Sequence, residues 1–164
     1  MPIESDEFRR ILGHCATGVS VVTARHPDGP PCGLSDNAFS SLSLHPPLVL
    51  VCVEHSADTY DCIRAAGAFA ISVLAADGER TARRFAGEAD GADKFEGVAW
   101  HQSPNGSIVL DEALAWVDCN VVAEHVAGDH TIFVGEVLTG DAVEGQPLIY
   151  YRGGYHGGNH GVGP

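Results

Sequence analysis

The sequence predicts a mainly β fold with short helices, in which antiparallel strands close fully or partly into a barrel. Its 164 residues are 45% hydrophobic and only 19% charged, which is the size and composition of one globular domain. Apolar and β-branched runs of strand length recur along the chain, and Gly, Pro and Asp turn signals separate them. A barrel suits such short strands because it removes exposed sheet edges.

Helix signals open the chain. Ser5 or Asp6 can cap a helix whose apolar residues follow a spacing of three and four. These apolar residues are Phe8, Ile11, Leu12 and Cys15. We expect a short amphipathic lid or packing helix that ends between residues 13 and 18.

Strand signals begin at residue 19. The β-branched stretch 19–24 and the polar stretch 33–44 flank a turn rich in Pro and Gly, and they predict a hairpin. The unbroken apolar run 48–53 predicts the central strand, covered on both faces. Later strands are expected over 68–74, 114–124, 131–143 and 148–151, helices over 58–66 and 78–85, and an exposed acidic loop over 88–93.

These elements leave no room for an interdomain linker. We expect a single domain over residues 1–164, with residues 1–7 as an N-terminal arm and the Gly-rich residues 156–164 as a flexible tail.

The net charge of the chain excludes some classes of binding partner. The formal net charge of −13 repels phosphate backbones and anionic lipids, so neither nucleic acid nor a membrane is an expected partner. No stretch reaches the ~18 apolar residues of a membrane span, and the N-terminus lacks a secretion signal. We therefore expect a cytoplasmic protein.

Cysteine and histidine content gives no metal or disulfide signature. The five cysteines are odd in number and show no C-x-x-C spacing, so we interpret all five as small buried thiols in a reducing compartment. No histidine falls in an H-x-x-x-H motif on a predicted helix or beside a cysteine pair, and no metal site is expected.

Hydroxyl and amide side chains crowd the stretch 33–44, which reads GLSDNAFSSLSL. A half-exposed strand whose serines face water explains the cluster on structural grounds. The functional alternative is a row of hydrogen-bond donors for a flat heteroaromatic ligand with several carbonyl and imine acceptors. The residues alone leave both interpretations open.

Several short motifs occur in a fixed order along residues 8–155. They are FR at 8–9, ATGVSVVTA at 16–24, the polar stretch just described, GAFAISVL at 67–74, FAG at 85–87, KFEGV at 94–98, GDH at 128–130, GEV at 135–137 and PLIYYRGGY at 147–155. This ordered set resembles the flavin reductase-like family of FMN-binding split barrels, which includes the reductase components of two-component monooxygenases. The resemblance implies a six-stranded antiparallel split β-barrel with Greek-key-like topology.

In that family the polar strand lines the flavin ring. The resemblance therefore places Ser35, Asp36, Asn37, Ala38 and Phe39 beside the ring, with Ser41 as a further contact. The family often has a hydroxyl residue at the position of Ala38 and an apolar residue at that of Asp36, so this chain departs from it in how the ring is recognised.

Other positions are expected near the flavin phosphate or ring. Ser56 and Thr59 fall where a helix begins, which suits a phosphate, although an N-cap explains them equally well. The resemblance adds Phe85, Lys94, Phe95 and Tyr155 to the cofactor-binding residues. Lys94 is the only lysine of the chain.

His130 follows a Gly-Asp turn, where a histidine commonly has a structural role. In the family this histidine stands where the nicotinamide meets the flavin, so the resemblance makes His130 the candidate catalytic residue. Hydride transfer needs no protein acid or base, and loss of His130 is expected to slow turnover without abolishing it.

The resemblance implies an NAD(P)H-dependent flavin reductase that transfers hydride to FMN or FAD, forms a homodimer and supplies a partner monooxygenase with reduced flavin. NADH and NADPH both remain open as co-substrates. No G-x-G-x-x-G follows a strand, so a Rossmann nucleotide domain is not expected. The alternatives are a protein with tightly held FMN that acts on another substrate and a haem-binding split barrel.

Overall fold

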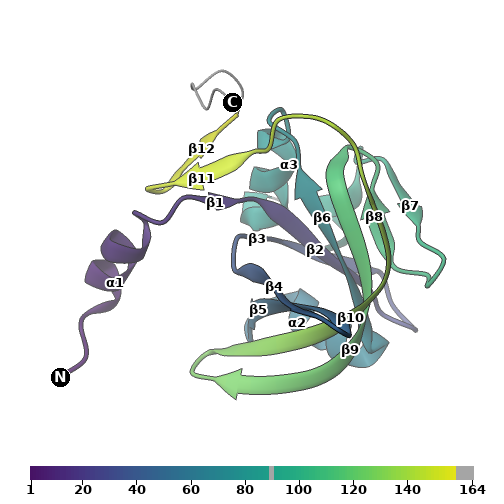
Figure 1. Cartoon of the computed structure of the whole chain (residues 1–164), viewed down its shortest axis with the longest axis horizontal. Coiled ribbons are helices and arrows are strands. Elements are labelled where there is room, and N and C mark those ends of the chain that lie inside the picture. The colour runs from purple at the N-terminus through teal and green to yellow at the C-terminus, as the bar shows by residue number, and fades with distance from the viewer. Residues whose placement is uncertain (89–90, 158–164) are drawn as a thin grey trace.

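The computed structural model describes residues 1–88 and 91–157, and a curved antiparallel sheet dominates it (Figure 1). Seven strands form this sheet in the order β3-β2-β6-β9-β10-β5-β4. Their bounds are β2 Ser20–Arg25, β3 Pro31–Asp36, β4 Phe39–Leu44, β5 Pro47–Glu54, β6 Ala68–Leu74, β9 Ala113–Ala127 and β10 His130–Ala142. The mainly β fold expected from the sequence is confirmed, with seven strands rather than six in the main sheet.

Smaller elements surround the main sheet. One small sheet has the order β1-β11-β12 and the other pairs β7 with β8. Their bounds are β1 Thr17–Gly18, β7 Trp100–Gln102, β8 Ile108–Leu110, β11 Ile149–Tyr151 and β12 Gly154–His156, and the helical segments are α1 Ser5–Leu12, α2 Asp58–Ala66, α3 Glu79–Arg83, η1 Arg84–Glu88 and η2 Gly91–Phe95. None of the helices in the two described ranges has the length and apolar character of a membrane span.

The two edge strands of the main sheet are consecutive in the chain. β3 ends at Asp36 and β4 begins at Phe39, so only Asn37 and Ala38 carry the chain from one edge to the other. The three Cα-to-Cα steps from Asp36 to Phe39 span no more than about 11 Å, and the sheet therefore curls until its edges approach each other. The result is a barrel that is split along one line, which we call the β3–β4 seam.

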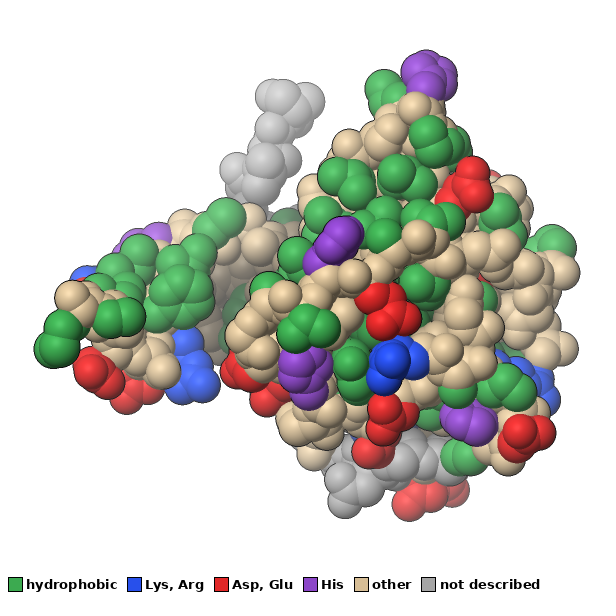
Figure 2. Space-filling view, turned by 90° about the horizontal axis from the view of Figure 1, so that it is seen from below, with side chains coloured by type: hydrophobic (Ala, Val, Ile, Leu, Met, Phe, Trp, Pro, Cys, Tyr) green, Lys and Arg blue, Asp and Glu red, His purple; other side chains and the backbone are tan. Residues whose placement is uncertain are grey.

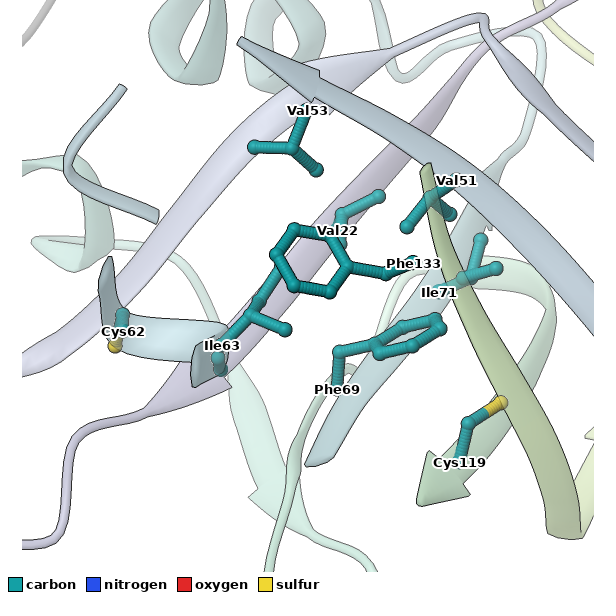
Figure 3. Packing of buried hydrophobic residues seen from close by; sticks show 10 residues of the cluster. Val22, Val51, Val53, Cys62, Ile63, Phe69, Ile71, Cys119 and Phe133 are labelled. Carbon is teal, nitrogen blue, oxygen red and sulfur yellow. The ribbon is translucent and has the colours of Figure 1, made fainter. Parts of the chain in front are cut away.

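The barrel interior is filled by side chains from the sheet and from α2. Phe69 on β6, Phe133 on β10 and Ile63 on α2 are fully buried and lie close together (Figure 3). Replacing a phenylalanine in such a position by alanine costs about 3–5 kcal/mol. A second buried cluster lies on the other side of β2, and Leu74, Phe85 and Phe95 belong to it.

The predictions for α2 and β6 are confirmed at both ends. α2 stops at Ala66 because Gly67 adopts a left-handed conformation, with φ of 64°, and its N–H donates to Ile63 O at 2.8 Å. A glycine tolerates this conformation without steric cost. β6 then starts at Ala68.

Two strand predictions need correction. The stretch 33–44 is not one strand, because the seam divides it into β3 and β4. The apolar run 48–53 lies in β5, which is next to the edge strand β4 instead of at the centre of the sheet. Residues 48–50 are accordingly only half-buried there.

The ends of the chain also differ from expectation. α1 begins after Glu4 without a side-chain cap, stops at Leu12 and buries none of its residues, so within this chain it is not a packing helix. His156 belongs to the end of β12 and pairs with Ile149. Residues 158–164 of the expected tail, His160 among them, lie outside the described residues, as do residues 89–90 of the expected acidic loop.

The expectation of five buried free thiols is wrong for four cysteines, of which Cys52 is free but only partly buried. Cys32 on β3 and Cys62 on α2 are joined as a disulfide with Cα atoms 6.4 Å apart, because α2 packs across β3. Cys15 is exposed. Cys119 fits the expectation, and burial raises the pKa of its thiol to about 12.

Candidate functional site

Two hollows open beside the β3–β4 seam and share part of their walls. The smaller has a volume of about 180 Å³ and the larger a volume of about 300 Å³. Ser35, Asp36 and Ala86 line both of them. The C-terminal end of β3 therefore lies between two halves of one candidate binding region, which we call the seam site.

The larger hollow gathers residues from several elements. β3 and η1 contribute residues on one side, and the ends of β5 and β10 contribute residues on the other. The lining residues are Leu34, Ser35, Asp36, Cys52, Glu54, Ala57, Phe85, Ala86, Gly87, Lys94 and His130. The smaller hollow adds Val19, Asn37, Tyr150 and Tyr155.

Side-chain hydrogen bonds with neighbouring helical segments hold β3 in place. Ser35 Oγ donates to Ala82 O of α3, and Lys94 Nζ donates to Gly33 O at 3.2 Å. Arg84 in turn donates to Lys94 O at 2.8 Å and to the carbonyl of Asp93. The strand that bears Asp36 is thereby tied to both α3 and η2.

An aromatic pair supports the same strand. Phe85 and Phe95 are almost fully buried, and their rings meet edge to face with centroids 5.0 Å apart, a favourable arrangement. They press against Gly33 so closely that a Cβ atom there would lie 2.7 Å from Phe85 Cε1. Glycine is thus required at position 33 for this packing.

Asp36 is the most unusual group of the seam site. Asp36 is only 8% exposed, and its Oδ1 accepts the Ala38 N–H at 2.7 Å. Oδ2 is buried and has no hydrogen-bond partner. Burial raises the pKa of this carboxyl from 3.8 to about 6, although the Ala38 and Asn37 N–H groups and the charge of His130 act to lower it.

His130 stands at the start of β10, opposite Glu54 of β5. Its Nδ1 lies 2.6 Å from Asp129 Oδ1, and this hydrogen bond lowers the pKa of the Asp129 carboxyl. A ring nitrogen held by a carboxylate fixes the orientation of the imidazole. The His130 side chain remains 43% exposed, so it is accessible from the larger hollow.

The C-terminal hairpin closes the smaller hollow. Tyr150 on β11 and Tyr155 on β12 lie with ring centroids 5.3 Å apart, and Arg83 of α3 lies over the Tyr155 ring at 5.1 Å. These contacts hold the two tyrosines against the barrel and give this hollow an aromatic wall.

The structure brings seven of the predicted site residues together in the seam site and leaves six outside its lining. Those that line it are Ser35, Asp36, Asn37, Phe85, Lys94, His130 and Tyr155. Ala38 and Ser41 are exposed near the seam, and Phe39 packs against the barrel core. Phe95 is buried in the second cluster, where it packs against Phe85.

Ser56 and Thr59 lie around the start of α2. The N-cap of this helix is Ala57, and no side chain caps it, so the N-cap interpretation of Ser56 and Thr59 is wrong. Ser56 is exposed and Thr59 is only 1% exposed. Ala57 is the residue of this segment that reaches the larger hollow.

Sequence reasoning missed the residues that reach the site from other elements. Cys52 and Glu54 come from the end of β5, and no local motif marks them. Ala86 and Gly87 fall within one of the matching motifs and Tyr150 within another, so attention to whole motifs could have found these three.

Within residues 1–88 and 91–157, no group of three or more His, Cys, Asp and Glu side chains is arranged to hold a metal ion. The seam site instead offers an aromatic wall, backbone groups of an interrupted sheet edge and one buried carboxyl. These features suit a flat, polar-edged organic ligand.

The fold defines a split-barrel protein with a candidate ligand-binding region at the seam. Residues 12–159 match the flavin reductase like domain, and the chain belongs to this family. The resemblance found from its motifs is thereby confirmed.

Curated relatives and solved structures agree with this membership. The reductase component of a 4-nitrophenol 4-monooxygenase/4-nitrocatechol 2-monooxygenase from Rhodococcus opacus is 45% identical over 152 residues, which are 93% of this chain and 80% of the relative. A flavin reductase (NADH) from Kitasatospora aureofaciens is 39% identical over 93% of this chain and 81% of its own length. The NADH:FAD oxidoreductase SgcE6 of Streptomyces globisporus C-1027, solved with NAD and FAD fragments, is 33% identical over 99% of both chains with a TM-score of 0.88.

The raised pKa of Asp36 makes stability depend on pH. A carboxyl whose pKa is higher in the folded state stabilises the fold below its unfolded pKa, and this contribution is lost as the pH rises through about 6. A shift of this size corresponds to about 3 kcal/mol. We therefore expect Asp36→Asn to gain up to about 3 kcal/mol relative to wild type between pH 4 and pH 7, measured by urea unfolding.

Asp129→Asn provides the control with the opposite sign. The pKa of Asp129 is lowered by its hydrogen bond with His130, so its contribution is present above the unfolded pKa and lost as the pH falls. This variant should lose stability relative to wild type toward pH 7. A stability difference for Asp36→Asn that does not change with pH contradicts the assignment.

Proposed function

We propose that this protein is an NAD(P)H-dependent flavin reductase that transfers hydride to FMN or FAD bound in the seam site. The observation that carries the proposal is the site itself, because a buried carboxyl oxygen without a partner and an aromatic wall meet at an interrupted sheet edge. The relatives named as flavin reductases support the same activity.

The residues of the seam site fit a flavin ring. When bound, the flavin supplies an acceptor for the hydride of the nicotinamide. Ser35, Asp36 and Asn37 would hold the polar edge of the ring through side-chain and main-chain groups, and Tyr155 would cover one side. Lys94 would contribute positive charge toward the flavin phosphate.

His130 would orient the incoming nicotinamide at the open side of the larger hollow. Its imidazole is held by Asp129 at 2.6 Å and is exposed to an approaching ligand. Positioning of two reactants contributes much of the acceleration when no protein acid or base is needed. His130 is therefore assigned to positioning and not to proton transfer.

The activity is tested by a steady-state assay that combines NADH and NADPH with FMN and FAD. Purified protein should oxidise at least one nicotinamide in a flavin-dependent manner. A protein that purifies yellow points to tightly held flavin, and one that purifies pale points to a diffusible flavin. Absence of nicotinamide oxidation with every combination contradicts the reductase assignment.

The role of His130 is tested with His130→Ala. We expect kcat/KM for the reduced nicotinamide to fall roughly ten- to a hundredfold, because a misplaced reactant loses much of the proximity effect. The dissociation constant for oxidised flavin should change less than twofold. His125→Ala removes an exposed histidine from β9 and serves as the matched control, with unchanged kinetics.

We further propose a homodimeric, cytoplasmic protein with one domain over residues 1–164, which delivers reduced flavin to a monooxygenase. α1 supports the dimer, because Phe8, Ile11 and Leu12 are 54%, 45% and 51% exposed. This helix projects from the barrel in Figure 1, and hydrophobic side chains gather on the left-hand lobe of Figure 2 that contains it. A second copy of the chain would cover these side chains.

The dimer is tested with the double substitution Phe8→Ser and Leu12→Ser. The wild-type chain should elute with the mass of two chains in size-exclusion chromatography with light scattering, and the variant with the mass of one. Because neither residue is buried within the chain, circular dichroism should stay unchanged. A wild-type protein with the mass of one chain rules out the dimer.

A further inference from the structure

The buried carboxyl of Asp36 is the starting point. Three buried side-chain oxygens lack a hydrogen-bond partner among the described residues, namely Thr17 Oγ1, Asp36 Oδ2 and Asp118 Oδ1. Of the residues that carry them, only Asp36 lines the seam site, and it lines both hollows. An unpartnered polar atom inside a binding region is a group prepared for a ligand.

The groups around Asp36 do not complete its hydrogen bonding. Ser20 on β2 donates to the main-chain oxygen of Asp36 and not to its carboxyl. Other elements present further titratable or charged groups to the seam site. These are Cys52 and Glu54 from β5, Lys94 from η2, His130 from β10 and Tyr150 and Tyr155 from the C-terminal hairpin.

Asp36 Oδ2 is already shielded from water in the free chain, and an ionised oxygen without a partner is costly in such surroundings. A flat ring seated in the seam site would also cover the part of Asp36 that is still exposed. Most polar atoms at the edge of an isoalloxazine are acceptors. A protonated carboxyl supplies a donor for one of them, whereas a carboxylate only accepts.

We propose that Asp36 binds the flavin ring as a neutral carboxylic acid, with Oδ2–H donated to a ring acceptor, so that flavin binding takes up one proton. This inference rests on the proposed flavin-binding function of the same site. The neutral acid also places no negative charge against a ring that receives the electron pair of the hydride.

In the free protein, part of the Asp36 carboxyl population is protonated near neutral pH. Its pKa of about 6 leaves about one carboxyl in ten protonated at pH 7, so the apparent affinity there is about tenfold below the affinity of the protonated form. Above pH 6 the affinity should fall by up to tenfold per pH unit, until the pH reaches the pKa of the bound state.

The test measures flavin binding by fluorescence quenching between pH 5 and pH 8.5, with riboflavin and FAD as probes. FMN is avoided because a phosphate monoester titrates with a second pKa of about 6. Calorimetry at pH 7.5 in two buffers with different ionisation enthalpies counts the protons. For wild type we expect the fall in affinity above pH 6 and an uptake close to one proton.

Asp36→Asn is the decisive variant. The amide is neutral at every pH, and its carbonyl oxygen can still accept the Ala38 N–H. It should bind flavin with an affinity independent of pH and without proton uptake. Asp118→Asn is the matched control, because Asp118 is also buried with an unpartnered oxygen but lines neither hollow. This variant should keep the wild-type dependence.

His130→Asn removes the imidazole that lines the larger hollow and leaves Asp36 in place. The pH dependence should survive in this variant and vanish in Asp36→Asn. The proposal is overturned by a wild-type affinity that is flat or rises with pH, by a dependence that persists in Asp36→Asn, or by its loss in His130→Asn.

The experiment distinguishes failure of the proposed function from failure of the role of Asp36. If neither flavin binds at any pH, the proposed function itself fails, whereas binding without proton uptake removes only the role of Asp36. If Asp36→Asn does not fold, carbon NMR of the wild-type Asp36 carboxyl with bound riboflavin decides. A protonated signal at pH 7.5 supports the proposal, and an ionised signal contradicts it.

Discussion

The two-residue connection between β3 and β4 is the constraint on which the site depends. It forces the first and last strands of a seven-stranded sheet to approach each other, yet these two strands are not hydrogen-bonded neighbours in the sheet. Backbone and side-chain groups at the seam therefore remain available, which a fully closed barrel does not allow. The candidate ligand-binding region lies where the closure of the barrel is interrupted.

Packing against β3 positions one side of this opening. The Phe85 and Phe95 rings need the space that Gly33 leaves, and Lys94 binds the carbonyl of the same glycine. Ser35 uses its hydroxyl for α3, so part of the serine-rich sequence fixes the strand instead of facing a ligand. That the rest of the polar stretch donates to a ligand stays a prediction.

Local signals made much of the fold predictable. Gly67 separates α2 from β6 with a left-handed turn, and both elements were expected with the observed bounds. The seam was not predictable in the same way, because residues 33–44 keep a strand-like composition across it. β12 was missed because a Gly-rich tail gives no strand signal, although β11 supplies its pairing partner.

Residues of the candidate site could be predicted only where they lie within one short stretch of the sequence. The residues from β3, η1 and η2 lie within motifs of the sequence, whereas Glu54 and Cys52 reach the same hollow because β10 pairs with β5. That pairing joins segments far apart in the chain, and periodicity carries no information about it. The Cys32–Cys62 bond has the same origin, since it depends on how α2 crosses β3.

The small sheet of β1, β11 and β12 links the projecting N-terminal helix to the wall of the smaller hollow. Thr17 pairs with Tyr150, and Arg152 N–H donates to Gly13 O at 2.9 Å, so the backbone after α1 is bonded directly to the hairpin that carries both tyrosines. A molecule seated on α1 would therefore transmit force to the aromatic wall through main-chain hydrogen bonds alone. The proposed dimer contact and the aromatic wall of the seam site are thus joined through one small sheet.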